Sequence, residues 1–357
     1  MTNVTVKPDF HTFRFSEALI ASSFGEDCFQ QVISTQAFRR LASIHFLGSI
    51  DYLLTGGHRG VEERQTRFDH SLAVAKLAKR FAEMKGAKHS EFQTIVVSAL
   101  LHDIGHAPLS HSLEPAFRSH FEIDHHLVGE KILRGEVRIG LKLAKVLQKF
   151  GVNNFEVMAL ISGVGTGIGK ELFSRAINVD TIEGIVRSAS YVMRREVLVN
   201  PIAVIDALAD LGRPSQDILD EFWMLKDRVY SALIQSRKGL VADLICKRYM
   251  ELNASAFKPS YYYGTEKELR RDHRLLFEIL DDFGRSDRIS AKVIKDGENI
   301  EFVRRRFVID AKVVLNTATD IDRRYLQTKE RVVVQIRKKG GEDAHTVPVH
   351  PGMQTLF

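Results

Sequence analysis

The stretch LLHDIGHAPLSHSLE, residues 100–114, places three histidines and two carboxylates behind an apolar lead-in. Proline cannot continue a helix and disfavours helical backbone at the residue before it. We therefore expect the helix that enters this stretch to end near His106, two residues before Pro108, and the chain then to turn. So many titratable side chains at the end of one helix predict a metal or catalytic site carried by a helical protein.

A second histidine-bearing helix is expected over residues 67–84, RFDHSLAVAKLAKRFAEM. Val74, Leu77, Ala78 and Phe81 fall on one helical stripe, and His70 lies one turn earlier on the same stripe. His70 is therefore predicted to point toward the core.

His102 also follows an apolar stripe, because it comes seven and three residues after Ile95 and Ala99. Asp103 adds a carboxylate beside this imidazole, and a buried charge needs a partner. A divalent cation would satisfy both groups, together with His70 from the neighbouring helix. The alternative is that each histidine is a core residue bonded to a backbone carbonyl.

The loop after Pro108 carries His111, with Glu114 three residues further on. An imidazole that titrates near neutrality suits proton transfer, and a carboxylate can orient it. The alternative is an ordinary surface histidine.

Composition is that of a globular protein of one large or two smaller domains, with 357 residues, 44% hydrophobic and 27% charged. Cys28 and Cys246 are the two cysteines, so neither a disulfide framework nor a cysteine zinc site is expected. The first residues lack the pattern of a signal peptide, and no run of 18 apolar residues occurs. We expect a cytoplasmic protein without a membrane segment.

Amphipathic helices are predicted from residue 29 to residue 192, and a further long helical stretch over residues 217–252. Beyond them, RRFVIDAKVVL (305–315) and ERVVVQIRKKGG (330–341) favour strands. The predicted fold is mostly α, a helical bundle with a small C-terminal α+β appendage. The expected parts are an N-terminal segment (1–28), the helical domain (29–255) and a basic C-terminal region (256–357).

The formal net charge of +6 is concentrated near the C-terminus, where residues 301–340 hold 11 Lys and Arg against 5 Asp and Glu. Clustered positive charge suits nucleic acid or a nucleotide effector as a partner. The alternative is a solvated face or a contact between subunits.

These motifs resemble one family. TRFDHS (66–71) followed by LLHDIGHAPLSH is similar to the HD-domain phosphohydrolases, and within them to the deoxynucleoside triphosphate triphosphohydrolases. VISTQAFRRLASIHFLG (32–48) and INVDTIEGIVRSA (177–189) resemble the same branch. The resemblance implies a helical HD-domain bundle and hydrolysis of a nucleotide to nucleoside and triphosphate.

The resemblance further implies a single divalent metal ion, of which Mn, Mg, Fe, Co, Ni and Zn all suit imidazole and carboxylate ligands. Its ligands would be His70, His102, Asp103 and Asp180. Asp180 rests on the match alone, since helical periodicity places it opposite the apolar stripe of its helix. Its alternative is a helix-start carboxylate.

The other roles implied by the resemblance concern substrate and proton transfer. Arg67, His106 and Arg187 would bind the substrate, and His111 with Glu114 would transfer a proton. A further histidine would enter the site from IDHHLVGEKIL (123–133), where the spacing to Gly129 favours His126 over His125.

Several positions depart from the family pattern, notably Phe46, Thr181, Glu183, Gly184 and Ser188. The metal motif is thus better matched than the nucleotide contacts. We expect a nucleotide substrate and a homo-oligomer, with two alternatives: another phosphoester substrate (a nucleoside monophosphate, a cyclic dinucleotide or single-stranded nucleic acid), or a non-catalytic nucleotide- or nucleic-acid-binding regulator.

Overall fold

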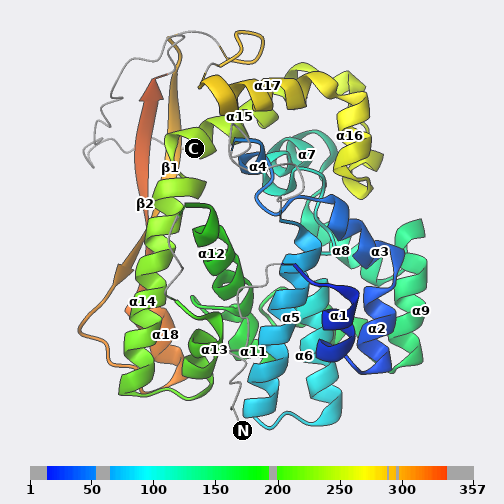
Figure 1. Cartoon of the computed structure of the whole chain (residues 1–357), viewed down its shortest axis with the longest axis vertical. Helices are drawn as coiled ribbons and strands as arrows, with labels where there is room; N and C mark the ends of the chain where they lie inside the picture. Colours follow the sequence, from blue (N-terminus) through cyan, green and yellow to red (C-terminus); the bar gives the residue numbers. More distant parts are fainter. Residues whose placement is uncertain (1–13, 54–64, 193–198, 288, 295–296, 336–357) are drawn as a thin grey trace, which may run out of the picture.

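The computed structural model of the chain describes residues 14–53, 65–192, 199–287, 289–294 and 297–335 (Figure 1). The part of the chain that it describes is mostly helical, with one two-stranded antiparallel sheet near the C-terminus. The predicted fold class is therefore confirmed. The predicted domain limits after residues 28 and 255 stay predictions.

The helices of the N-terminal and central parts are α1 (Glu17–Ser23), α2 (Asp27–Ile33), α3 (Gln36–Arg39), α4 (Ile50–Leu53), α5 (Arg67–Met84), α6 (His89–Leu101), α7 (Glu114–Phe121), α8 (His125–Leu133), α9 (Leu141–Lys149), α10 (Asn154–Ile161), α11 (Ile168–Ser174), α12 (Val179–Val192) and α13 (Pro201–Ala209). The remaining elements are α14 (Arg213–Val229), α15 (Arg237–Leu252), α16 (Glu266–Asp272), α17 (Arg274–Ser286), β1 (Asn299–Ile309), α18 (Ala318–Arg324) and β2 (Tyr325–Gln335).

α5 packs against α6, and α12 packs between α5 and α14 (Figure 1). Thr66 caps α5, its hydroxyl accepting a hydrogen bond from the Asp69 backbone N–H at 3.2 Å. His70 is fully buried one turn into this helix, as its stripe predicts. The apolar stripe that follows it is buried as well: Val74, Leu77, Ala78 and Phe81.

α6 ends earlier than the sequence predicts, at Leu101 rather than near His106, and His102 occupies its C-cap. The cause is a close approach of two backbones. A Cβ atom on Gly105 would lie 1.9 Å from the carbonyl oxygen of His125, so residue 105 tolerates only glycine. The chain must turn before that contact, ahead of the proline.

The expected long helix over residues 217–252 is two helices, α14 and α15, separated by a π-helical turn at Tyr230–Ile234. Ser236 caps α15, its hydroxyl accepting from the Gly239 N–H at 3.1 Å. A Cβ atom on Gly239 would lie 2.5 Å from the Ile234 carbonyl oxygen, so this glycine permits the sharp turn. Helical periodicity is similar on both sides of the break, which is why the sequence pattern does not reveal it.

The C-terminal hairpin pairs β1 with β2 in antiparallel register from Asn299↔Gln335 to Ile309↔Tyr325, with α18 between the strands. It packs on α14, where the Trp223 indole N–H donates to the Val308 carbonyl at 3.1 Å. Acidic side chains partly neutralise the positive charge of the hairpin. For example, Arg306 of β1 forms an ion pair with Asp227 of α14 at 3.3 Å.

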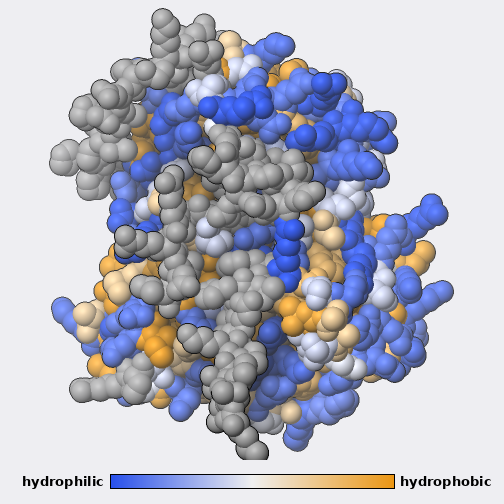
Figure 2. Space-filling view, viewed as in Figure 1, coloured by the Kyte–Doolittle hydropathy of each residue, from blue (hydrophilic) through white to orange (hydrophobic). Residues whose placement is uncertain are grey.

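The face seen in Figure 2 is mostly hydrophilic over α16 and α17, with apolar residues interspersed lower down. Among the described residues, no helix combines the length and the apolar character needed to span a bilayer.

Candidate metal centre and its cavity

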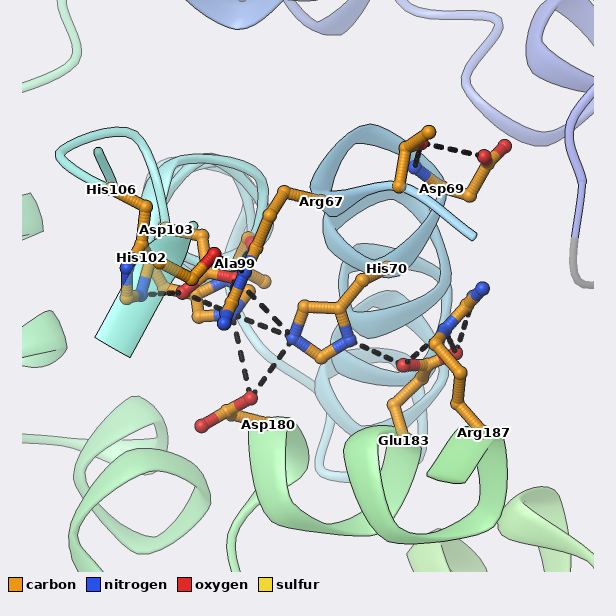
Figure 3. Close-up of polar contacts among 12 residues, drawn as sticks. Arg67, Asp69, His70, Ala99, His102, Asp103, His106, Asp180, Glu183 and Arg187 are labelled. Atoms are coloured by element: carbon orange, nitrogen blue, oxygen red, sulfur yellow. Dashed lines mark hydrogen bonds and ion pairs between the residues drawn. The ribbon is translucent and has the colours of Figure 1, made fainter. Parts of the chain in front are cut away.

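Three side chains from three different helices converge at one point (Figure 3). His70 Nε2 lies 3.0 Å from Asp180 Oδ1, and the two imidazole Nε2 atoms of His70 and His102 lie 3.2 Å apart. His102 Nε2 lies 3.6 Å from the same Asp180 oxygen. These atoms come from the first turn of α5, the C-cap of α6 and the first turn of α12.

The hydrogen bonds on the far edges of the two rings orient their lone pairs toward each other. His70 Nδ1 contacts the Glu183 carboxylate, and His102 Nδ1 lies 2.8 Å from the Ala99 carbonyl oxygen. Both acceptors lack a hydrogen, so both Nδ1 atoms carry one. Two neutral rings would then point two lone pairs at one another, and a cation or an added proton must lie between them.

The donor set fits a divalent metal ion. Two imidazole nitrogens 3.2 Å apart, with a carboxylate oxygen within 3.6 Å of each, suit an ion at about 2 Å from every ligand. Without an ion, burial lowers the pKa of His102, but Asp103 and Asp180 outweigh it and raise that pKa to about 9. The proton thus takes the place that a metal ion would fill.

Asp180, the residue that periodicity alone could not support, is brought to this point by the crossing of α12 over α5. Its side chain is about half exposed (53%). Desolvation raises the pKa of its carboxyl, yet the hydrogen bonds with His102 and His70 hold it well below its usual range.

Asp103 lies beside the three converging residues. Its Oδ1 is 3.4 Å from His102 Nε2, and its Oδ2 is 3.6 Å from His70 Nε2. Arg67 donates to Asp103 Oδ2 at 2.7 Å and to Ser110 Oγ at 3.1 Å. Arg67 is buried and already holds a carboxylate, so a phosphate would share this cation with Asp103.

A second cluster adjoins the first through Asp103, whose Oδ1 lies 3.1 Å from His106 Nε2. It joins His106, His111, Glu114 and His125, with one ligand-type atom of each within 4.8 Å of the others. The His125 Nδ1 lies 2.6 Å from Glu114 Oε2, and the rings of His106 and His125 stack at 4.5 Å. His106 Nδ1 is buried and has no hydrogen-bond partner among the residues that the structure describes.

The two histidines of the 125–126 pair are placed differently. His125 is the one that contacts Glu114, whereas His126 is exposed, with its ring 4.0 Å from that of His125. Both side chains line the cavity described next. The sequence spacing that favours His126 therefore stays a prediction.

Both clusters border one cavity of about 400 Å³. Phe46 forms part of its wall, with its ring 4.6 Å from the His70 ring and only 7% exposed. Other parts of the wall come from α12, from the π-helical turn and from α15. A cavity of this size suits a small molecule the size of a nucleotide.

Comparison with known proteins relates this arrangement of side chains to a known domain. Residues 67–209 match the model of the HD domain, a range that contains both clusters. By this match, residues 67–209 of the chain are an HD domain. This HD domain runs from α5 to α13, so parts of the cavity wall, including Phe46 and Tyr230, lie outside the matched range.

Relatives match over short ranges. The uncharacterized protein YwfO of Bacillus subtilis is 32% identical over 165 residues, which are 45% of this chain and 35% of the relative. A deoxyguanosinetriphosphate triphosphohydrolase-like protein of Neorickettsia sennetsu is 34% identical over 115 residues, which are 30% of this chain and 27% of the relative. The deoxynucleoside triphosphate triphosphohydrolase SAMHD1 of Bos taurus is 33% identical over 94 residues, which are 24% of this chain and 15% of the relative.

The match to these three relatives thus spans only 15–35% of their length. A hypothetical protein from Aquifex aeolicus shares the fold, with a TM-score of 0.59 at 15% identity over 87% of this chain and 92% of that one. The resemblance to the deoxynucleoside triphosphate triphosphohydrolase-like branch of the HD domains is confirmed.

Within the HD domain, the structure does not bring Arg187 to the cavity. Its side chain is fully buried, donates to Glu183 Oε1 at 2.6 Å and to Gln65 Oε1 at 2.9 Å, and so lies behind His70.

Sequence reasoning noted Glu183 only as a departure from the family pattern and missed its contact with the Nδ1 of His70, a metal-ligand candidate. Carboxylates in this position fix ring orientation and raise ligand basicity. The available signal was its spacing, three residues after Asp180 and four before Arg187.

Proposed function

We propose that the protein is a metal-dependent phosphohydrolase that hydrolyses deoxynucleoside triphosphates to nucleoside and triphosphate. The observation that carries the proposal is the facing Nε2 pair of His70 and His102, beside a second cluster of three histidines and Glu114. His102, Asp180 and all three histidines of the second cluster line one nucleotide-sized cavity. Relatives whose names include triphosphohydrolase support the substrate.

His70, His102, Asp103 and Asp180 would hold one divalent ion, which supplies charge and lowers the pKa of a water molecule. Arg67 and His106 lie next to this point, so they would bind and orient the phosphate oxygens. Arg187 would act through Glu183 rather than by touching the substrate.

Proton transfer is assigned to the second cluster. Desolvation and the neighbouring His106 and Arg67 hold the pKa of His111 well below its usual range, so the free ring is neutral. A bound phosphate brings negative charge, which raises the pKa of a nearby imidazole. His111, with Glu114, would therefore take up a proton when substrate is present and deliver it to the leaving oxygen.

The test is turnover by protein loaded separately with Mn, Mg, Fe, Co, Ni or Zn and given deoxynucleoside and ribonucleoside tri-, di- and monophosphates. Release of nucleoside plus triphosphate is expected. The variant His102→Ala/Asp103→Ala should lose both turnover and bound metal.

The matched control His89→Ala/Glu83→Ala removes an exposed histidine and an exposed carboxylate and should keep both properties. Full activity in the folded His102→Ala/Asp103→Ala variant would overturn the proposal. Inactivity of the metal-loaded wild type on the whole panel would remove the proposed substrate and leave other phosphoesters to be tried.

A further inference from the structure

Asp243 enters the cavity wall from α15, outside the matched HD domain. Its Oδ1 accepts hydrogen bonds from Ser49 Oγ at 2.8 Å and from Ser112 Oγ at 2.6 Å. Ser112 Oγ in turn accepts from the Ser49 backbone N–H at 3.0 Å. The Ser112 hydroxyl is thereby committed as a donor to the carboxylate.

This arrangement depends on a close approach of two loops. Gly48 has a φ of +60°, and a Cβ atom there would lie 2.4 Å from the Leu109 carbonyl oxygen and 2.9 Å from Ser112 Oγ. Only glycine allows the loop before α4 to come so near the loop after Pro108. Ser49 and Ser112 are both buried, so their hydrogen bonds to Oδ1 fix the orientation of the Asp243 carboxylate.

The second carboxylate oxygen is left for the cavity. Within the described ranges, Oδ2 receives no hydrogen bond and no cationic side chain pairs with Asp243. Burial raises the pKa of this carboxyl and the two hydroxyls oppose that shift. A carboxylate in such a place is costly unless a further donor reaches it.

We propose that Asp243 Oδ2 accepts a hydrogen bond from the nucleoside part of the ligand and thereby determines its specificity. The proposal rests on the proposed function, since it takes the ligand to be a nucleotide. Phosphate oxygens are excluded as partners because they carry negative charge and no hydrogen at neutral pH. The donor is an amino or ring N–H of the base, or a hydroxyl of the sugar.

Neighbouring wall residues suit the same end of the ligand. Leu47, Ile50, Tyr230 and Ile234 line the cavity together with Asp243. Apolar and aromatic side chains with one well-placed polar group are typical of a site for a base or sugar. The side chains that suit phosphates lie elsewhere in the wall: Arg67 is on α5, and His102 and Asp103 directly follow α6.

The variant Asp243→Asn reverses the polarity of the cavity-facing atom. Both serine hydroxyls need an acceptor, so the amide oxygen takes the place of Oδ1 and the NH2 group takes the place of Oδ2. The wild type then presents an acceptor to the ligand, and the nearly isosteric variant presents a donor.

The experiment measures binding of unphosphorylated nucleosides to the full chain by calorimetry, with turnover of the triphosphates followed in parallel. Deoxycytidine carries an amino group at C4 where deoxyuridine carries a carbonyl oxygen. If the base is read, the wild type should favour deoxycytidine by roughly tenfold, and Asp243→Asn should reverse the preference. If Asp243 recognises the sugar, the preference for deoxycytidine over 2′,3′-dideoxycytidine should instead become smaller in the variant.

Asp282→Asn, the same change at an exposed position on α17, should alter neither ratio. Should Asp243→Asn not fold, Ser49→Ala removes one of the two donors that orient the carboxylate and should move the same ratio toward one. Unchanged ratios in folded variants, or no nucleoside binding by the wild type, would overturn the proposal. A reversed ratio in a protein without turnover would uphold Asp243 and overturn the hydrolase.

Discussion

Glu183 contacts the Nδ1 atom of His70 on the ring edge opposite the Nε2 that faces His102 and Asp180. The carboxylate thus fixes which nitrogen is available as a metal ligand. It also holds Arg187, so one side chain links the candidate metal centre to the buried interior of α12.

Replacing this carboxylate by an amide should weaken metal binding. In Glu183→Gln the amide oxygen can still accept from the ring, but the negative charge that strengthens the imidazole as a ligand is lost. We expect affinity for a divalent ion to fall by roughly 10- to 100-fold. Titration of chelator-treated protein by calorimetry measures it, and Glu130→Gln, in an exposed ion pair on α8, is the control.

The same variant should destabilise the fold, because Arg187 loses its buried counter-charge, at a cost of roughly 3–5 kcal/mol. Adding Arg187→Met should recover much of that stability without recovering metal affinity. If stability and metal affinity recover together, Glu183 acts only through folding.

The free energy of unfolding should depend on pH through Lys226. Burial lowers the pKa of its ammonium group from 10.5 to about 8, and its Nζ lies 4.4 Å from the Trp223 ring centre and 4.7 Å from that of Phe307. Between pH 8 and 10.5 the unfolded chain binds the proton that the folded chain has released. Stability from this group should therefore rise with pH across that window and be lowest below pH 8.

Lys226→Met should remove this dependence and stabilise the protein at pH 7 by up to about 3 kcal/mol. Denaturant unfolding of wild type and variant at pH 7, 8, 9 and 10 measures both effects. Parallel pH curves for the two proteins would contradict the assignment. Lys247→Met, on the exposed side of α15, is the matched control and should leave the curve unchanged.

Glu266 ties the C-terminal part to the loop that carries His111. Its Oε1 accepts from the backbone N–H groups of His45 at 2.9 Å and Leu109 at 3.3 Å, and its Oε2 from the Tyr52 hydroxyl at 2.5 Å. Leu109 has a φ of +60°, a strained conformation for a leucine that surrounding contacts must maintain.

We expect Glu266→Ala to loosen residues 109–112, so that amide hydrogen exchange there becomes faster. The kcat should fall by about tenfold, with a smaller change in KM. Glu266→Gln keeps the acceptor oxygen for the two N–H groups and should restore much of the loss. Equal activity of the alanine variant and the wild type, at unchanged exchange rates, would exclude a positioning role.

The adjacent histidines 125 and 126 offer a paired test of geometry against spacing. The contact with Glu114 predicts that His125→Asn lowers kcat by roughly 10²- to 10⁴-fold, the range typical of a lost proton-transfer group. His126→Asn, one residue away and exposed, should have a smaller effect. The reverse order would show that the spacing to Gly129 identifies the functional ring.

Local sequence determined the parts of the site that lie within one helix or one turn. The inward direction of His70 follows from its place on the stripe of α5, and the cluster of His102 and Asp103 follows from the end of α6. These features depend on 3.6-residue periodicity and on the adjacency of two residues. Each can be read from a dozen positions without knowing the neighbours in space.

Tertiary structure decided which distant residues meet at those points. Asp180 reaches His70 across 110 positions because α12 packs against α5, and Asp243 reaches Ser112 across 131 because α15 packs against the turn at Ser110–Ser112. The break at Tyr230 and the contact of His125 with Glu114 likewise come from packing against other segments. Periodicity says which way a side chain points, but the partner on the other side is set by the close packing of the whole core.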